Sequence, residues 1–263
     1  MSQDLRNPAT DERFEVAVAV ETVALEIREA LAWLGAIGIR GVQWPAMRSG
    51  VRPRDLDASG RRDLQATLRR QQLVMAGVDL WIPPEHFVDP TRVDRAVAAV
   101  EESLRFAAEF GRVPVSLRLP SASDADSESL ASTVAALVAI ADRLGVSLAD
   151  HAEPSTPREG VAVGIDPVAV LAGGKDPCEA VFAAAGALAA ARLADLDRGG
   201  LRSPLGESVG ERRLDPVRYR VALEVAGFRG LVVIDPRQWR DPRGGVLQTA
   251  RLWMEAGRPA GLP

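Results

Sequence analysis

Acidic side chains directly follow several short apolar runs in this sequence. Asp150 follows "GVSLA", Asp166 follows "VAVGI" and Asp235 follows "GLVVI", so each carboxylate stands at the end of a predicted buried strand. Carboxylate oxygens are the ligands that Mg²⁺ and Mn²⁺ prefer, and a pair of carboxylates can also transfer protons. These three residues are therefore candidate metal ligands, and Asp150 and Asp235 are also candidate catalytic acids or bases.

Helix capping offers a simpler explanation for some of these carboxylates. Aspartate followed by proline precedes a predicted helix at Asp89, Asp176 and Asp215. There the aspartate can cap the helix, and proline fits the first helical position. Asp166 and Asp235 are also followed by proline. What favours a site for these two is their place at the end of an apolar strand, with no loop in between.

Other polar and aromatic side chains also follow the predicted strands. Arg192 could stabilise a developing negative charge, and His86 could orient a substrate from a loop over the strand ends. A sugar ring could stack on tryptophan, although core packing explains the tryptophans equally well. The candidate substrate-binding residues are Gln43, Trp44, Trp81, Arg118 and Asp195.

His151 stands next to Asp150. Neighbouring residues of a strand point to opposite faces, so the two side chains should not both enter one site. We expect Asp150 to face into the site and His151 to lie at its rim.

The elements that must position these residues follow a recurring pattern: an amphipathic helix, a glycine and a short apolar run. It occurs in "EIREALAWLGAIGIRGVQW" and returns in "TVAALVAIADRLGVSLAD" and "RYRVALEVAGFRGLVVID". Glycine takes the left-handed conformation that closes a helix, and a buried parallel strand follows. The predicted strands are Phe14–Val20, Gly41–Trp44, Leu73–Leu80, Val113–Leu117, Val146–Ala149, Val161–Ile165, Ala190–Ala194 and Gly230–Ile234. Helices are predicted near 22–35, 57–71, 90–110, 127–144, 177–189, 215–227 and 245–256.

This alternation favours a single (β/α)₈ TIM barrel over residues 14–263, preceded by a polar N-terminal tail, residues 1–13. The helix after strand five is short or missing. A doubly wound sheet has fewer strands, and its dinucleotide-binding form needs a G-x-G-x-x-G that does not follow the first strand here. In a TIM barrel the loops after the strands share one face, so the candidate residues would meet there.

Composition excludes several classes of function. A net charge of −4 gives no basic surface for nucleic acid. The polar N-terminus lacks the apolar segment of a secretory signal, and the longest apolar run, "AVFAAAGALAAA", is too short to span a membrane. We therefore expect a cytoplasmic protein with a small-molecule partner and no nucleic-acid or membrane partner. The alanine- and leucine-rich outer helices could provide the contact surface of a homodimer.

The chain resembles the sugar phosphate isomerase/epimerase family, the xylose isomerase-like TIM barrels, over nearly its whole length. The segments that carry the resemblance are "REALAWLGAIGIRGVQW", "RPRDLDASGRRDLQATLRRQQLVMAGVDL", "VAVGIDPVAVLAGGKDPCEAV", "ARLAD", "SPLGE" and "YRVALEVAGFRGLVVID". The resemblance implies one divalent metal, held after strands five to eight by a glutamate, an aspartate, a histidine and a glutamate. The matching positions here are Asp150, Asp166, Arg192 and Asp235.

This chain departs from that pattern. Both glutamates are shortened to aspartate, the histidine is replaced by Arg192, and Ala169 stands where the family has a second histidine. A guanidinium has no lone pair for a metal. Arg192 could instead supply the positive charge itself, in a network with Asp150 and Asp235.

Two functions follow from these features. The first is a sugar isomerase/epimerase-like enzyme that moves a proton next to the carbonyl of a carbohydrate or sugar phosphate. In that enzyme Mg²⁺ or Mn²⁺ would assist, although a site without any cofactor fits the sequence equally well. The alternative is a non-catalytic barrel that binds a small anion or a protein partner, with Arg192 in place of the metal.

Overall fold

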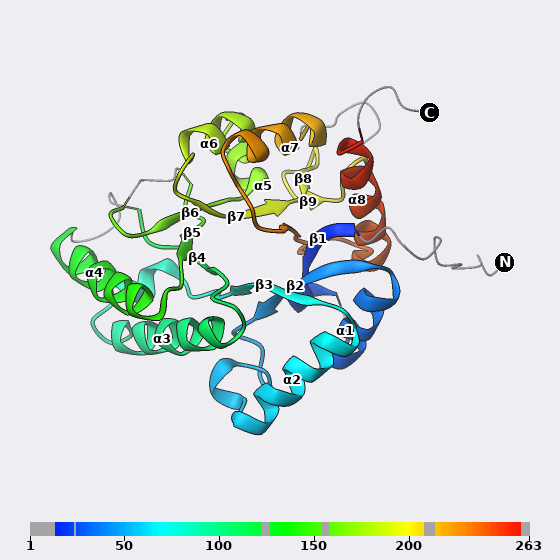
Figure 1. Cartoon of the computed structure of the whole chain (residues 1–263). Helices are drawn as coiled ribbons and strands as arrows, with labels where there is room; N and C mark the ends of the chain where they lie inside the picture. The colour runs from blue at the N-terminus through cyan, green and yellow to red at the C-terminus, as the bar shows by residue number, and fades with distance from the viewer. Residues whose placement is uncertain (1–13, 24, 122–126, 154–157, 208–213, 259–263) are drawn as a thin grey trace.

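The computed structural model describes residues 14–23, 25–121, 127–153, 158–207 and 214–258. Parallel strands form a closed barrel in the order β1-β10-β7-β6-β5-β4-β3-β2 (Figure 1). The strands are β1 Phe14–Ala19, β2 Ile39–Pro45, β3 Val74–Asp79, β4 Val115–Leu117, β5 Leu148–Asp150, β6 Ala162–Ile165, β7 Leu188–Leu193 and β10 Val232–Ile234. The predicted TIM barrel is thus confirmed, with each predicted strand at its place in the sequence.

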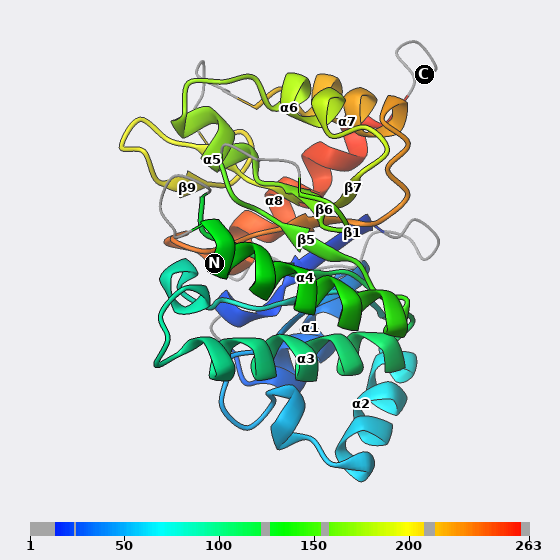
Figure 2. The same cartoon turned by 90° about the vertical axis from the view of Figure 1, so that its left-hand side faces the viewer.

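Helices surround the barrel, as Figure 2 shows from the side. They are α1 Ile27–Ala36, α2 Ala58–Arg70, α3 Val93–Glu109, α4 Ser127–Leu144, α5 Pro167–Ala172, α6 Pro177–Ala183, α7 Pro216–Val225 and α8 Pro242–Ala256. Short 3₁₀ helices are η1 Val20–Thr22, η2 Pro53–Asp55 and η3 Pro84–Phe87, and β8 Asp195–Leu196 pairs with β9 Arg202–Ser203. Among the described residues, no helix is long and apolar enough to cross a bilayer.

Several helices differ from the prediction. The first predicted helix starts at Ile27, because the chain leaves β1 through the 3₁₀ turn η1. The alanine-rich helix α6 ends at Ala183, before Gly186 takes a left-handed φ of 83°. The short helix α5 was not predicted, and it begins where Asp166 accepts a hydrogen bond from Val168 N. Asp176 and Asp215 cap α6 and α7 as expected. Asp89 does not cap α3, which begins only at Val93, because its Oδ1 binds Thr91 N and Oγ1 in the turn before the helix.

The described chain between β5 and β6, residues 151–153 and 158–161, contains no helix. This agrees with the expectation of a short or missing helix after strand five. A groove of about 700 Å³ lies beside α4 at this place, lined by Leu130, Val134 and Val138 of α4 and by Arg158 and Gly160 of the connection.

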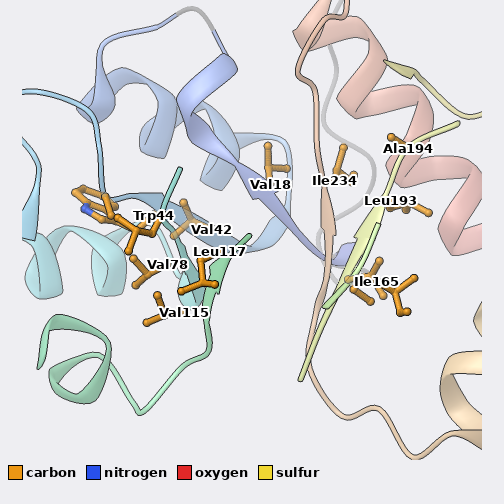
Figure 3. Packing of buried hydrophobic residues seen from close by; sticks show 14 of the residues in the cluster. Val18, Val42, Trp44, Val78, Val115, Leu117, Ile165, Leu193, Ala194 and Ile234 are labelled. Carbon is orange, nitrogen blue, oxygen red and sulfur yellow. The ribbon is translucent and has the colours of Figure 1, made fainter. Parts of the chain in front are cut away.

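The main core lies between the strands and the helices, where side chains such as Val18, Val78 and Leu193 pack (Figure 3). The alternate residues of each strand face the barrel interior. Ala17 and Ala19 form a separate small cluster there with Val233. This alternation decides which of the polar residues at the strand ends enter the barrel.

Candidate functional site

Arg192, on β7, lies between two carboxylates inside the barrel. Its Nη1 donates to Oδ2 of Asp235 at 2.7 Å, and its Nη2 donates to Oδ1 of Asp79 at 2.7 Å. Strand β3, which carries Asp79, lies across the barrel from β7, so the guanidinium spans the interior. The side chain of Arg192 is 2% exposed and that of Asp235 is 0% exposed. The ion pair expected between Arg192 and Asp235 is present. The second carboxylate that Arg192 binds is Asp79, not Asp150 as expected.

Two further arginines complete this network. Arg202, from the β8–β9 hairpin, binds both oxygens of Asp166 and lies 3.2 Å from Oδ2 of Asp235. Arg237, from the loop after β10, donates through Nε to Oδ1 of Asp235 at 2.8 Å. The network, which we call the interior ion cluster, consists of Asp79, Asp166, Asp235, Arg192, Arg202 and Arg237. Its three carboxylates and three guanidiniums carry no net charge.

Asp150 faces away from the barrel interior, contrary to the prediction. Its Oδ1 accepts hydrogen bonds from Leu119 N at 3.0 Å and Ala152 N at 2.9 Å, and Arg158 Nη1 lies 2.6 Å from its Oδ2. The carboxylate therefore fastens the ends of β4 and β5 to the chain that follows. Burial raises the pKa of Asp150, while these backbone bonds and Arg158 oppose the rise.

His151 enters the interior in its place, so the expected orientation of the pair was reversed. Its side chain is buried, and Nε2 lies 3.1 Å from Oγ of Ser116 on β4. The ring fills the space beside Gly164, where an added Cβ would lie 2.4 Å from Nε2. Burial, and then the charge of Arg192, lowers the pKa of His151 well below its usual range. The imidazole is therefore neutral at physiological pH.

Gln43 and Ser116 join His151 to form a neutral polar layer beside the interior ion cluster. Gln43 Nε2 donates to Ser116 Oγ at 3.2 Å. Three buried polar atoms of this region have no hydrogen-bond partner among the described residues: Gln43 Oε1, His151 Nδ1 and Arg192 Nε. Such atoms are usually satisfied by ordered water or by a bound polar group.

Trp81 is an accessible aromatic side chain above the ion cluster. It is 40% exposed, and its Nε1 donates to Asp79 Oδ2 at 2.8 Å. The guanidinium of Arg237 lies 4.1 Å from its ring centroid, and that of Arg192 lies 5.3 Å away. These contacts hold Trp81 in one orientation, with the interior ion cluster beneath its ring and part of its surface exposed to solvent.

Glu21 and Arg118 are exposed residues that follow β1 and β4 on the same side of the barrel. Burial raises the pKa of Glu21, while Arg48 lowers it and Asp79 raises it further. Arg118 contributes positive charge to Asp150 and His151, and it forms no ion pair with any residue that the structure describes. Both side chains can be reached by a ligand in the mouth of the barrel.

Three predicted site residues lie elsewhere. Trp44, on β2, points outward into the core between the strands and the helices, where its Nε1 donates to Val51 O at 3.0 Å and its ring lies 6.1 Å from that of Phe106. Asp195 accepts hydrogen bonds from Leu196 N at 2.8 Å and Leu214 N at 3.1 Å, so it orders the loop after β7. His86 Nε2 lies 2.7 Å from Nη1 of Arg92 within the loop after β3.

The donor atoms of the mouth do not fit a divalent metal. No group of three or more His, Cys, Asp or Glu within the described ranges is arranged to hold an ion. Each predicted ligand already binds a guanidinium: Asp150 binds Arg158, Asp166 binds Arg202 and Asp235 binds Arg192. A metal would have to displace buried arginines and would then lie beside their charges. The positive charges that these carboxylates bind are arginine side chains of the same chain.

Known structures share this architecture. The crystal structure of a xylose isomerase domain protein from Planctomyces limnophilus matches 93% of this chain and 95% of its own, with a TM-score of 0.65 and 16% identity. D-psicose 3-epimerase with D-tagatose, from Clostridium cellulolyticum H10, matches 91% and 96%, with a TM-score of 0.69 and 15% identity. A sugar phosphate isomerase/epimerase from Parabacteroides distasonis matches 95% and 96%, with a TM-score of 0.68 and 13% identity.

At the level of sequence, neither a family model nor a curated protein matches this chain. The similarity is thus one of structure, and it extends over nearly the full length of both partners in each comparison. The closed barrel, its strand order and these matches together identify the fold as that of the xylose isomerase-like TIM barrels.

Proposed function

We propose that this chain binds a small, neutral, carbohydrate-like molecule at the mouth of its barrel without the help of a divalent metal. The observation that carries the proposal is the position of Arg192, which lies buried between Asp79 and Asp235. A permanent positive charge stands where the resemblance implies a metal-binding histidine. The function therefore rests on groups that need no added cation.

The charge balance of the mouth favours a neutral ligand. An anion site needs positive charge that is not already balanced, whereas the guanidiniums of Arg192, Arg202 and Arg237 are each paired with a carboxylate. Arg118 is not paired with a carboxylate among the described residues, but a single arginine would bind a phosphate only weakly. The unpartnered atoms of Gln43 and His151 match hydroxyl groups, which both donate and accept hydrogen bonds. Trp81 adds an apolar surface for a sugar ring.

A second candidate function is proton transfer next to a carbonyl without a metal, and Glu21 favours it. Its side chain is exposed at the mouth, while desolvation of the carboxyl group by the surrounding chain raises its pKa, and a raised pKa favours general-base catalysis. Asp235 is a poor choice for this role because its side chain is 0% exposed and binds three guanidiniums. Asp150 is equally poor because it faces outward.

Thermal unfolding in the presence of D-fructose, D-tagatose or D-psicose tests the binding proposal. A sugar at about 100 times its dissociation constant should stabilise the fold by about 2.7 kcal/mol, which is roughly 5–10 °C for a chain of this size. The shift should be the same with EDTA and with Mn²⁺, and it should disappear in Trp81→Ala. Phe182→Ala, which removes an aromatic side chain of similar exposure from α6, is the matched control and should keep the shift.

Two outcomes would reject the proposal. A sugar shift that requires Mn²⁺ and is abolished by EDTA would mean that a metal binds after all. A shift with inorganic phosphate and none with any sugar would mean that the site binds anions.

The catalytic candidate has a separate test. Incubation of a bound sugar in D₂O should exchange the hydrogen next to its carbonyl, as NMR would detect. Glu21→Gln should abolish this exchange and leave the thermal shift intact. Absence of exchange in the wild-type protein would reject catalysis and leave binding as the function.

A further inference from the structure

The hydrogen bonds of the neutral polar layer determine which nitrogen of His151 carries the proton. The Ser116 hydroxyl has two partners among the described residues, Gln43 Nε2 at 3.2 Å and His151 Nε2 at 3.1 Å. The amide nitrogen of Gln43 can only donate, so Ser116 Oγ accepts there and has its own proton left to donate. Ser116 is 1% exposed, and an unpaired buried hydroxyl is costly, so this proton goes to His151 Nε2. Since the imidazole is neutral, its single proton is on Nδ1.

This assignment gives each unpartnered atom of the region a definite role. His151 Nδ1 and Arg192 Nε are donors, because each carries a proton, and Gln43 Oε1 is an acceptor. The three side chains are all buried, with 5%, 2% and 2% exposed. The described chain therefore leaves two buried donors and one buried acceptor open.

The three side chains meet in one part of the barrel interior. Gln43 and His151 both bind the hydroxyl of Ser116. Ser116 is the register partner of Asp79 in the β3–β4 pair, and Arg192 binds Asp79 through Nη2 at 2.7 Å. The guanidinium of Arg192 thus reaches the polar layer from the opposite wall of the barrel.

We propose that Gln43, His151 and Arg192 form a buried subsite for one uncharged hydroxyl group of the ligand. This inference rests on the proposed function, because the hydroxyl belongs to the carbohydrate-like molecule bound beside Trp81. A hydroxyl group donates one hydrogen bond and accepts two, which matches the open acceptor and the two open donors. It would donate to Gln43 Oε1 and accept from His151 Nδ1 and Arg192 Nε.

Other polar groups match this set less well. A carboxylate or phosphate oxygen has no proton for Gln43 Oε1, and an ammonium group has no lone pair for the two N–H donors. A water molecule can also make these bonds, so it is the other source of such an oxygen, and a ligand hydroxyl would displace it. The guanidinium of Arg192 lies 5.3 Å from the ring centroid of Trp81, so the subsite adjoins the apolar surface proposed for the sugar ring.

NMR of the full chain with nitrogen-labelled histidine tests the subsite without any sugar. The chain has two histidines, His86 and His151, so His86→Gln assigns their signals. His151 should be the neutral tautomer with its proton on Nδ1. Ser116→Ala should raise the population with the proton on Nε2, because nothing then donates to that nitrogen. Ser103→Ala is the matched control, since this buried hydroxyl donates to Ala99 O at 2.8 Å within α3, and it should leave the tautomer unchanged.

Calorimetric titration with sugars that lack one hydroxyl tests the ligand. The probes are D-fructose, D-tagatose and D-psicose with the monodeoxy derivatives of each. For a sugar that binds, removal of one particular hydroxyl should weaken binding at least about tenfold, because it leaves the three buried groups unpaired. Gln43→Met should bring the affinity ratio between the parent sugar and this derivative close to one. Gln248→Met, which removes an amide that donates to Leu205 O from α8, should leave the ratio unchanged.

The outcomes separate this inference from the binding proposal. A wild-type His151 with its proton on Nε2 would overturn the subsite whether or not a sugar binds. Sugar binding to which all hydroxyls contribute alike, or a ratio that survives Gln43→Met, would overturn the subsite and leave the binding proposal intact. If none of the sugars binds, both proposals fail, and a proton on His151 Nδ1 would then mean that the polar layer holds only water.

Discussion

Replacing Arg192 by methionine should destabilise the fold strongly, and the structure indicates which carboxylate is responsible. Without the guanidinium, Asp235 keeps Arg202 and Arg237, whereas Asp79 keeps, among the described residues, only the indole N–H of Trp81 as a donor. Removing one partner of a buried ion pair leaves an uncompensated charge, which costs about 3–5 kcal/mol. For a chain of this size we expect a decrease in Tm of roughly 6–20 °C.

Urea denaturation of wild type and variants measures this loss. Asp79→Asn, introduced into Arg192→Met, should recover much of the stability because the amide removes the uncompensated charge while Trp81 can still donate to its oxygen. Arg28→Met is the matched control, since Arg28 is 81% exposed and pairs with Asp63 at 2.9 Å. An exposed pair of this kind contributes about 0–1 kcal/mol.

The reasoning would be refuted if Arg192→Met lost no more stability than Arg28→Met. It would also be refuted if Asp79→Asn gave no recovery in the Arg192→Met chain. Either result would mean that the interior ion cluster is hydrated enough for its charges to tolerate the loss of a partner.

Three further predictions concern the interior. The pKa of His151 is lowered in the folded state, so below about pH 6.5 the unfolded chain binds a proton that the folded chain does not. The free energy of unfolding of the wild type should therefore fall relative to that of His151→Gln as the pH drops, by up to about 1.4 kcal/mol per pH unit. Urea titrations at several pH values measure this, and a difference between the two proteins that does not change with pH would contradict it. Gly164→Ala should cost about 1–3 kcal/mol by overpacking against His151, and calorimetry should find the cost relieved when His151→Ala is added. Tyr219→Phe removes the hydroxyl that donates to Arg192 O at 3.2 Å and should cost about 0.5–1.5 kcal/mol, whereas an unchanged denaturation midpoint would mean that water takes over the bond.

The barrel could be predicted because its signals are local. Glycine at the end of an amphipathic helix and the apolar run that follows are both contained in about twenty residues, and their repetition defines the fold. The expected position of Arg192 inside the barrel followed from the same alternation of strands and helices. Even the gap after strand five could be read from the sequence, because no amphipathic segment lies there.

The partners of Arg192 could not be predicted in the same way. Arg202 and Arg237 come from a hairpin and a loop without hydrophobic periodicity, so no pattern aligns them with the carboxylates. The orientation of Asp150 and His151 was also ambiguous. Strand β5 has only three residues, all of them buried, so the alternation of buried and exposed positions that fixes a strand face was absent.

The described residues between β5 and β6 form no helix, so this sector of the barrel has less packing on its outer side. The carboxylate of Asp150 joins β4, β5 and the described part of the connection through three hydrogen bonds. Protein segments with few packing partners open locally without global unfolding. Amide hydrogens of β5 should therefore exchange with solvent sooner than those of β2, and this sector would be the route by which water reaches His151.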